Sequence, residues 1–483
     1  MITVANKKTI ILLFLLLILA LSVRLYDLNT EDAWFDEGFT LLSVSEDSIS
    51  GTIDVSQEVE SKPFGFYVIL NLWSKLFGAS IFSLRFFSVL VGIISVGLIY
   101  LLGKELFSED VGLYSAFFLS ISLFDVIYSQ EARVYSFFST LTILSILMFV
   151  KLVKKELLDK KNGENNLFDN NNTYFIWLFL TNFLLNSIHY FSWLIICCET
   201  IIFIYLFRKD IYNLKKWFFY IGLTFISSIP FVISMLENFS KINLKLVGVF
   251  SVMWGFPLFV SKLGLFLLFI MGILFVLAIY LIVKKHQIIL DFYENIKKKH
   301  LVFLLIGIIL YHLLIFIFVR DLYSPFFLTR FSLFCLPFLF ILFGKILVDF
   351  KLKKLKAFSI VLILILALTS LAVYYNETTK EEWAGVAQLI ANDSNEDVVF
   401  FDIGSATVPF SYYFDGKNQL TSLSKENKDD FDLLKNQDNF WLVLSHNRKS
   451  SEEYRDPITK DLYVETYQFK DIEVLHFIRG YRE

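Results

Sequence analysis

The sequence predicts an all-α polytopic membrane protein of about eleven transmembrane helices, followed by a small extracytoplasmic α/β domain. Hydrophobic residues make up 56% of the 483 residues, and the 55 Phe exceed what soluble domains contain. Long apolar runs are bounded by charged residues. Residues 376–483 hold 12 basic and 21 acidic side chains, a net of −9, which leaves +6 of the total of −3 for residues 1–375. Two parts of different chemistry therefore meet near residue 375.

The apolar runs are long enough to act as membrane spans. A bilayer core about 30 Å thick requires roughly 20 apolar helical residues for each crossing, because unpaired backbone groups are not tolerated in lipid. Runs of this kind predict spans at 9–23, 84–104, 111–128, 134–153, 174–188, 190–207, 217–236, 256–283, 301–319, 328–349 and 357–375. The first run lacks a small-x-small cleavage site, so we expect Lys7 and Lys8 to flank an uncleaved signal anchor.

The lysines and arginines indicate the orientation of these spans. Short cytoplasmic loops carry an excess of basic residues. With a cytoplasmic N-terminus, the inner loops collect 21 basic residues, against nine on the outer side of residues 1–375. We therefore expect a multi-pass protein of the cell membrane with its N-terminus in the cytoplasm. Because eleven is odd, the outer loop 24–83 and the tail 376–483 are both expected outside the cytoplasm.

The outer loop and the tail have patterns of their own. Residues 24–62 hold ten carboxylates, and Pro63 begins the apolar stretch Phe64–Phe77, which suits a helix lying on the membrane surface. In the tail we expect a helix and three strands, at Glu381–Ala391, Val398–Phe401, Phe440–Leu444 and Val474–Ile478. The predicted domains are thus a membrane domain over 1–375 and an α/β domain over 376–483.

Polar and ionisable residues gather at the outer ends of the predicted spans. Lipid makes such groups expensive unless they line a cavity or extend to the interface. We therefore expect a cleft at the outer membrane surface that brings carboxylates and cations together. The candidates are Asp36, Glu37, Glu60, Lys62, Arg85, Gln130, Arg133, Tyr135, His189, Tyr190 and Arg330.

These candidates also have plainer interpretations. Asp36 and Glu37 equally suit solvated acids of an acidic loop. The arginines equally suit side chains that extend to lipid phosphates, and His189 beside Tyr190 is typical of the aromatic belt at a membrane interface. Asp125, inside a predicted span, is expected to satisfy polar neighbours rather than to act chemically.

Six polar clusters follow one another over residues 1 to about 350, namely Trp34-Phe35-Asp36-Glu37-Gly38, Lys62-Pro63, Leu84-Arg85-Phe86, Gln130-Glu131-Ala132-Arg133-Val134-Tyr135, His189-Tyr190-Phe191 and Arg330-Phe331. In order and spacing these clusters resemble the protein mannosyltransferase and aminoarabinose transferase superfamily. These are membrane glycosyltransferases of the GT-C fold, family 39-like. The chain lacks the Trp-Trp-Asp-Tyr-Gly motif of oligosaccharyltransferases, which disfavours transfer of a whole oligosaccharide to asparagine.

The resemblance implies a reaction and roles for the candidate residues. A single sugar passes from a polyprenyl-phosphate donor to a hydroxyl of a lipid, glycan or protein at the outer face, with inversion. Asp36 would take the acceptor proton, and Arg133, Arg330 and Lys62 would hold the donor phosphate. Glu37 would orient the acceptor or, with Asp36, bind an optional divalent cation. No cofactor is required, and membrane lipids but no nucleic acid are expected partners. The implied substrate-binding residues are Glu60, Arg85, Gln130, Tyr135, His189 and Tyr190.

Two other classes of membrane protein stay open at this point. A polysaccharide polymerase or ligase shares the outer site and the lipid-linked donor, although a large outer loop late in the chain would favour it, whereas here the large loop is the first. A transporter of lipid-linked sugars places its ionisable residues near the midplane, often on broken helices with internal repeats. In this sequence the polar clusters lie at the outer rim, and no repeat is visible.

Overall fold

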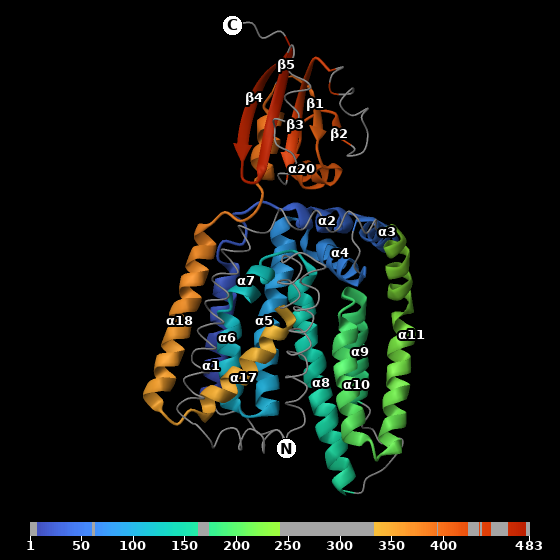
Figure 1. Cartoon of the computed structure of the whole chain (residues 1–483), viewed down its shortest axis with the longest axis vertical. Helices are drawn as coiled ribbons and strands as arrows, with labels where there is room; N and C mark the ends of the chain where they lie inside the picture. Colours follow the sequence, from blue (N-terminus) through green and yellow to red (C-terminus); the bar gives the residue numbers. More distant parts are fainter. Residues whose placement is uncertain are drawn as a thin grey trace.

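A bundle of long helices carries a smaller sheet at one end (Figure 1). The computed structural model describes residues 7–59, 63–162, 173–241, 333–393, 395–423, 434, 437–445 and 462–479. The bundle helices are α1 (Lys7–Leu25), α5 (Ile81–Leu106), α6 (Glu109–Ser120), α7 (Leu123–Ser129), α8 (Val134–Asn162), α9 (Thr173–Ile188), α10 (Ser192–Phe207), α11 (Ile211–Lys241), α17 (Leu336–Asp349) and α18 (Lys353–Asn376). The predicted spans 256–283 and 301–319 lie outside the described residues, as do Glu60, Lys62 and Arg330.

The bundle has the helices of a multi-pass membrane protein. Within the described residues, α1, α5, α8, α11 and α18 are each long and apolar enough to cross a membrane, and α6 with α7 makes a sixth span if that bent pair counts as one. Helices α9 and α10 are apolar but shorter, with 16 residues each. All of them fall on predicted spans, so the mostly helical membrane fold is confirmed, while the total of eleven crossings stays a prediction.

The predicted continuous span 111–128 is broken in the structure. Helix α6 ends at Ser120 and α7 begins at Leu123, with an angle of 61° between them. A helix end leaves carbonyl groups without intrahelical partners. The fully buried Arg24 of α1 donates to the carbonyl oxygens of Leu119 and Ser120, each at 3.1 Å, and pairs with Asp125 of α7. Asp125 therefore satisfies a buried polar neighbour, as the sequence suggested.

A helical layer covers the end of the bundle that faces the sheet. It consists of α2 (Phe35–Val44), α3 (Ile49–Val59) and α4 (Gly65–Phe77), which lie across the ends of the long helices (Figure 1). Helix α4 forms where an interfacial helix was expected, and its 13 residues, about 20 Å long, are too short to cross a membrane. The Asn71 side-chain amide ties α4 to the end of α2 by donating to the carbonyl oxygens of Val44, at 3.0 Å, and Glu46, at 2.8 Å.

The tail folds into a five-stranded mixed sheet with short helices beside it. The strand order is β2-β1-β3-β5-β4, in which β1 runs parallel to β2 and β3, and β5 runs antiparallel to β3 and β4. Trp383, Val386 and Phe410 from the helices pack with Trp441 and Val474 of the sheet in one core. The elements are α19 (Trp383–Ala391), α20 (Thr407–Tyr413), β1 (Val398–Phe401), β2 (Leu420–Ser422), β3 (Asn439–Ser445), β4 (Leu462–Phe469) and β5 (Ile472–Arg479).

Three of the five strands were expected from the sequence, namely β1, β3 and β5, together with helix α19. The sequence analysis did not anticipate β2 and β4. Strand β4 joins β5 through a tight turn at Lys470 and Asp471, where Asp471 has a φ of 57°. Aspartate tolerates this left-handed conformation better than most residues.

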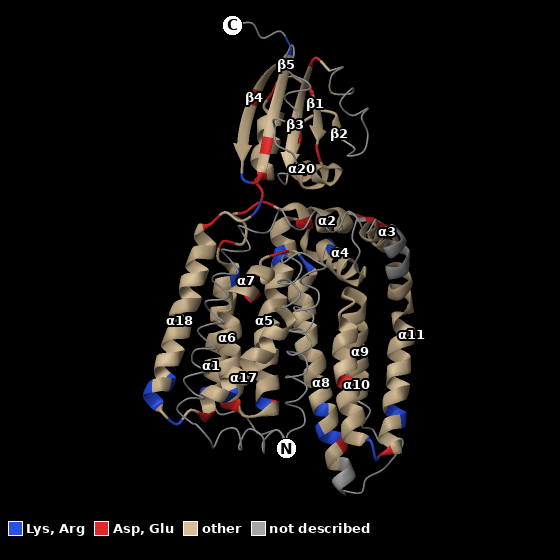
Figure 2. Cartoon of the chain, in the orientation of Figure 1, with Lys and Arg blue, Asp and Glu red and all other residues tan. Residues whose placement is uncertain are grey.

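Charged residues are unevenly distributed along the bundle. Figure 2 shows Lys and Arg gathered at the ends of α8, α11 and α18 that lie farthest from the sheet. This is the arrangement that the count of basic residues in the loops predicts. The assignment of this end to the cytoplasm stays a prediction.

Candidate active site

The two adjacent acids of the outer loop lie in the first turn of α2 and point in different directions. Successive residues of an α-helix are rotated by about 100°, so Asp36 and Glu37 cannot face the same surroundings. The Glu37 side chain is fully buried, whereas that of Asp36 is 20% exposed. The fold thus gives one acid to the interior and leaves the other accessible.

Glu37 is held by cations and by the backbone. Its Oε1 accepts from Arg85 Nε at 2.9 Å and from the Ala132 N–H at 2.8 Å, and its Oε2 accepts from Arg85 Nη2 at 2.7 Å and Lys380 Nζ at 3.3 Å. Burial by itself would raise the pKa of Glu37, but the charges of Arg85 and Lys380 and these hydrogen bonds outweigh it and lower the pKa to about 2. Glu37 is therefore an ionised carboxylate with both oxygens engaged.

Arg85 of α5 holds the loop that leads into α2. Besides its two bonds to Glu37, it donates to the carbonyl oxygens of Leu28 at 3.0 Å, Glu31 at 2.8 Å and Asp32 at 2.8 Å. A guanidinium has five N–H donors, and all five are used here. Residues 28–37 are thus fixed on a bundle helix.

Arg133, which directly precedes α8, lies beside the accessible acid. Its guanidinium donates to the carbonyl oxygen of Asp36 at 2.8 Å, and its Nη2 lies 3.8 Å from Asp36 Oδ2. The Arg133 side chain is 2% exposed, and its Nη1 also lies 3.4 Å from the Thr40 hydroxyl and 3.5 Å from the Tyr67 hydroxyl. A cation and an accessible carboxylate are therefore side by side where α2, α4 and α8 meet.

The other described candidates lie at the same end of the bundle as Asp36 and Arg133, but they contact different groups. The Gln130 amide donates to the carbonyl oxygens of Arg24 at 3.1 Å and Tyr26 at 2.7 Å. The Tyr135 ring contacts Tyr128, with ring centroids 5.2 Å apart. Gln130 thereby ties the end of α7 to the end of α1.

His189 and Tyr190 lie in the short connection between α9 and α10. The His189 ring packs against Phe138 of α8 at 4.9 Å between centroids, and its Nδ1 accepts from the Phe191 N–H at 3.2 Å. This connection therefore packs against the first turns of α8, which begins directly after Arg133.

Two residues of the tail that were not among the predicted candidates contact α2 at the acid pair. Lys380, in the segment between α18 and α19, reaches Glu37, and Glu381 Oε2 accepts from the Phe35 N–H at 2.8 Å. These contacts join positions about 345 residues apart in the chain. No local pattern marks such a pairing, and the only signal was the position of the two charges just beyond the last predicted span.

One group of described side chains could hold a metal ion, and it lies in the sheet domain. The ligand atoms of Asp393, Asp397 and His476 are all within 4.8 Å of one another. His476 Nε2 lies 3.1 Å from Asp397 Oδ2 and 3.7 Å from Asp393 Oδ2. The arrangement is compatible with a divalent cation but involves neither Asp36 nor Glu37.

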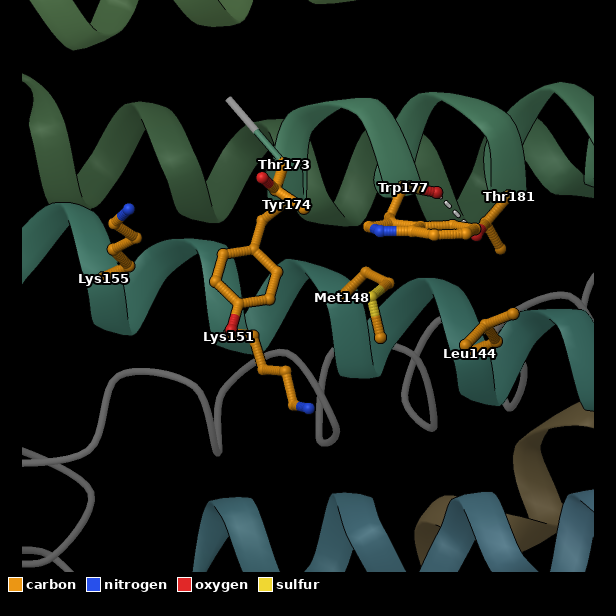
Figure 3. A pocket seen from close by; sticks show the side chains of 8 residues that line it. All are labelled: Leu144, Met148, Lys151, Lys155, Thr173, Tyr174, Trp177 and Thr181. Carbon is orange, nitrogen blue, oxygen red and sulfur yellow. Dashed lines mark hydrogen bonds between the residues drawn. The ribbon is translucent and has the colours of Figure 1, made fainter. Parts of the chain in front are cut away.

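A cavity of about 690 Å³ lies between α8 and α9, toward the end of α8 far from Arg133 (Figure 3). Apolar and aromatic side chains line it together with Lys151 and Lys155. None of the candidate residues that the structure describes lines it. Lysine beside Tyr174 and Trp177 is typical of a membrane–water interface, so this cavity is separate from the candidate site.

Comparison with known proteins agrees with this architecture. Residues 61–160 match the model of the family described as dolichyl-phosphate-mannose-protein mannosyltransferase. No curated protein has a significant sequence match to the chain.

The fold is similar to solved structures along nearly the whole chain. One is ArnT from Cupriavidus metallidurans bound to undecaprenyl phosphate, with 11% identity, a TM-score of 0.60, and coverage of 96% of this chain and 97% of that chain. Another is the archaeal oligosaccharyltransferase AglB from Archaeoglobus fulgidus, in complex with an inhibitory peptide and a dolichol-phosphate, with 9% identity, a TM-score of 0.58, and coverage of 96% of this chain and 74% of that chain. The chain therefore has the GT-C fold along nearly its whole length, and the match of residues 61–160 to the mannosyltransferase family model agrees with the resemblance seen in the sequence.

Proposed function

We propose that this chain is a glycosyltransferase that moves a single sugar from a polyprenyl-phosphate donor to an acceptor hydroxyl at the outer face of the membrane, with inversion. One observation carries the proposal: the accessible carboxylate of Asp36 lies beside the Arg133 guanidinium at one end of a GT-C bundle. The ArnT and AglB structures hold lipid phosphates, which supports a donor of that class. The acceptor is a hydroxyl of a lipid, a glycan or a protein.

In the proposed reaction Asp36 acts as the general base. The acceptor oxygen forms a bond to C1 of the sugar as the bond between C1 and the phosphate oxygen breaks, and the lipid phosphate leaves with the electron pair. The acceptor proton passes to the Asp36 carboxylate. A single displacement of this kind inverts the anomeric centre and requires no cofactor.

Cations would stabilise the departing phosphate. Arginine provides planar donors that match phosphate oxygens, and Arg133 is fixed next to Asp36 by its bond to the backbone there. Lys62 and Arg330 are proposed to join it on the phosphate. Such groups act where negative charge develops, which is the usual source of electrostatic stabilisation in transfer reactions.

The contacts of Glu37, Arg85 and Gln130 favour positioning roles for these three residues. From the sequence, Glu37 was expected to orient the acceptor or to bind an optional cation, yet both of its oxygens are already engaged. The N–H donors of Arg85 are likewise used within the protein, and Gln130 binds backbone carbonyl groups. For substrate binding we retain the proposal for Glu60, Tyr135, His189 and Tyr190.

In the proposed function each predicted domain has a role and a location. Residues 1–375 would form the transferase domain, and residues 376–483 an extracytoplasmic domain next to the site. The N-terminus would lie in the cytoplasm, as the count of basic residues predicts.

Turnover of a defined donor tests the proposal. Purified protein is incubated with a panel of polyprenyl-phosphate sugars and a mixture of hydroxyl acceptors, and release of polyprenyl phosphate is measured. We expect release with at least one donor and a loss of about 10²–10⁴-fold in Asp36→Asn, because this change removes the basic oxygen and keeps the shape. Asp47→Asn, an exposed acid in the loop after α2, is the matched control. Asp36→Asn activity above about a tenth of wild type would exclude Asp36 as the base.

A further inference from the structure

Two helices that are far apart in the sequence complete each other's N-termini. The first N–H groups of a helix have no partner inside the helix. Neither Trp34, before α2, nor Glu382, before α19, caps its own helix with its side chain. Instead Glu381 accepts from the N–H of Phe35 in α2 at 2.8 Å, and Asp32 accepts from the N–H of Ala384 in α19 at 2.7 Å.

Charge adds to this reciprocal capping. A carboxylate at a helix N-terminus is favoured by the helix dipole as well as by its hydrogen bonds. Glu31 extends the contact by accepting from the Thr379 hydroxyl at 2.9 Å and the Lys380 N–H at 3.3 Å. The loop before α2 and the segment before α19 therefore form one connected unit, which we call the clamp and define as residues 31–37 with 379–384.

Lys380 lies at the centre of the clamp. Its side chain is 8% exposed, and burial, followed by the neighbouring Arg85 charge, lowers the pKa of its ammonium group, whereas Glu37 opposes that shift. An ammonium group is buried at such a position only when a carboxylate compensates it. Lys380 thus depends on Glu37 in the folded state, and Glu37 gains a second cation beside Arg85.

The loop before α2 and α2 itself make further contacts with the sheet domain. The Tyr413 hydroxyl of α20 accepts from the Ala33 N–H at 2.6 Å. A Cβ at Gly38 would lie 3.0 Å from Cδ of Pro409, which is tighter than most Cβ contacts, so glycine favours this close approach of α20 to α2. Figure 1 shows α20 directly above α2.

We propose that the clamp is a positioning device that sets the orientation of Asp36, with Lys380 and Glu381 as its positioning residues. The inference rests on the proposed role of Asp36 as the base. Tail residues hold Phe35 and Glu37, the positions on either side of Asp36, so the direction of the base depends on the docked tail. The sheet domain is therefore part of the catalytic apparatus without contacting the reacting atoms.

Turnover of Lys380 variants tests this role. Lys380→Met keeps the length of the side chain and removes the charge. We expect a fall in kcat of about 10- to 100-fold with the donor KM within about twofold, because a displacement of about 1 Å costs on the order of 10²-fold. Lys380→Arg should recover most of the rate. Lys417→Met, an exposed lysine of the same domain, is the control, and Lys380→Gln replaces Lys380→Met if that variant fails to fold.

Hydrogen exchange in the full chain gives a readout independent of activity. In Lys380→Met and in Glu381→Ala, amide exchange should increase in both 31–44 and 379–391, since each segment caps the other. Unchanged exchange in both segments would overturn the clamp while leaving the proposed function intact. Faster exchange with unchanged kcat would overturn its positioning role. Absence of phosphate release by the wild type with every donor would instead count against the proposed function, and the exchange result would still decide whether the segments are coupled.

Discussion

Two buried arginines use the same chemistry in different regions of the molecule, Arg24 within the bundle and Arg85 at the candidate site. Each donates five hydrogen bonds and pairs with a buried carboxylate, Asp125 for Arg24 and Glu37 for Arg85. Arg24 has all its acceptors in helices α1, α6 and α7, whereas Arg85 has all of its acceptors between residues 28 and 37.

The difference lies in what each pair holds in place. Arg24 stabilises a break between two helices, where no candidate catalytic group is present. Arg85 stabilises the segment that carries Asp36, and its partner Glu37 also binds Lys380 from the tail. The two pairs thus differ in their expected effect on turnover, because only the Arg85–Glu37 pair stands next to Asp36, the proposed base. Four predictions test this difference.

Loss of Arg85 should have the largest effect, on both stability and turnover. Arg85→Met leaves Glu37 without its main cation, and breaking a buried pair costs on the order of 3–5 kcal/mol of unfolding free energy. We also expect polyprenyl-phosphate release by the folded fraction to fall by about 10²-fold or more, since the loop before α2 loses its support. Thermal unfolding and release are measured together, with Arg208→Met as control. Release above a tenth of wild type would contradict a link between Arg85 and Asp36.

Loss of Arg24 should cost similar stability and little turnover. We expect Arg24→Met to lower the unfolding free energy by about 3–5 kcal/mol, while release per folded molecule stays within about threefold of wild type. The double variant Arg24→Met with Asp125→Leu should recover part of the stability, because replacing both charges by apolar groups is often neutral. If release falls as far as in Arg85→Met, the distinction between the two regions is wrong.

Arg133 should affect donor affinity rather than folding. A charge-assisted hydrogen bond contributes on the order of 1.5–3 kcal/mol, so Arg133→Ala should weaken donor binding by roughly 10- to 150-fold. Arg133→Lys should recover only part, because lysine lacks the planar fork. Donor affinity and thermal stability are compared in the same detergent. Equal affinity of the Lys variant and wild type would indicate that Arg133 merely extends toward lipid headgroups.

The smallest expected effect is a difference between wild type and Glu37→Gln in how thermal stability depends on pH in acid. The pKa of Glu37 in the folded protein is about 2, lowered from 4.5. A carboxyl group of lowered pKa contributes stability above its unfolded value and loses that contribution as the pH falls through its folded value. The thermal midpoint should therefore decline between about pH 4.5 and pH 2 in wild type and less steeply in Glu37→Gln. Glu58→Gln should follow the wild-type curve. Parallel curves for wild type, Glu37→Gln and Glu58→Gln would show that Glu37 does not cause the loss of stability in acid.

Much of the helical architecture could be predicted from the sequence because lipid imposes a simple length rule. The last predicted span, 357–375, is helix α18, and the apolar run at 134–153 is the first part of α8. The strands at 398–401 and 440–444 were visible because apolar residues stand between turn residues. The break after Ser120 could not be predicted, because it depends on Arg24 reaching carbonyl groups 95 and 96 positions away.

The candidate site was predictable only in part. Asp36 and Arg133 were found from clusters of polar residues at span ends, and the structure places them 3.8 Å apart. The different surroundings of Asp36 and Glu37 could not be predicted from the sequence. They depend on which side of helix α2 faces α5 in the folded protein. The contact of Lys380 with Glu37 could not be predicted either. A single lysine after a span is common, and only the structure shows that this one reaches Glu37.

The distance along the chain between the two halves of the clamp has a consequence for biosynthesis. Lys380 follows Glu37 by 343 residues. At about 5–20 residues per second, the ribosome needs roughly 17–70 s to produce the lysine after the glutamate. Through that interval Glu37 has no Lys380 to pair with, and the Phe35 N–H has no Glu381 carboxylate to accept from it. The clamp therefore forms only when the tail has been synthesised and docked, so shorter chains lack the contacts that we propose align Asp36.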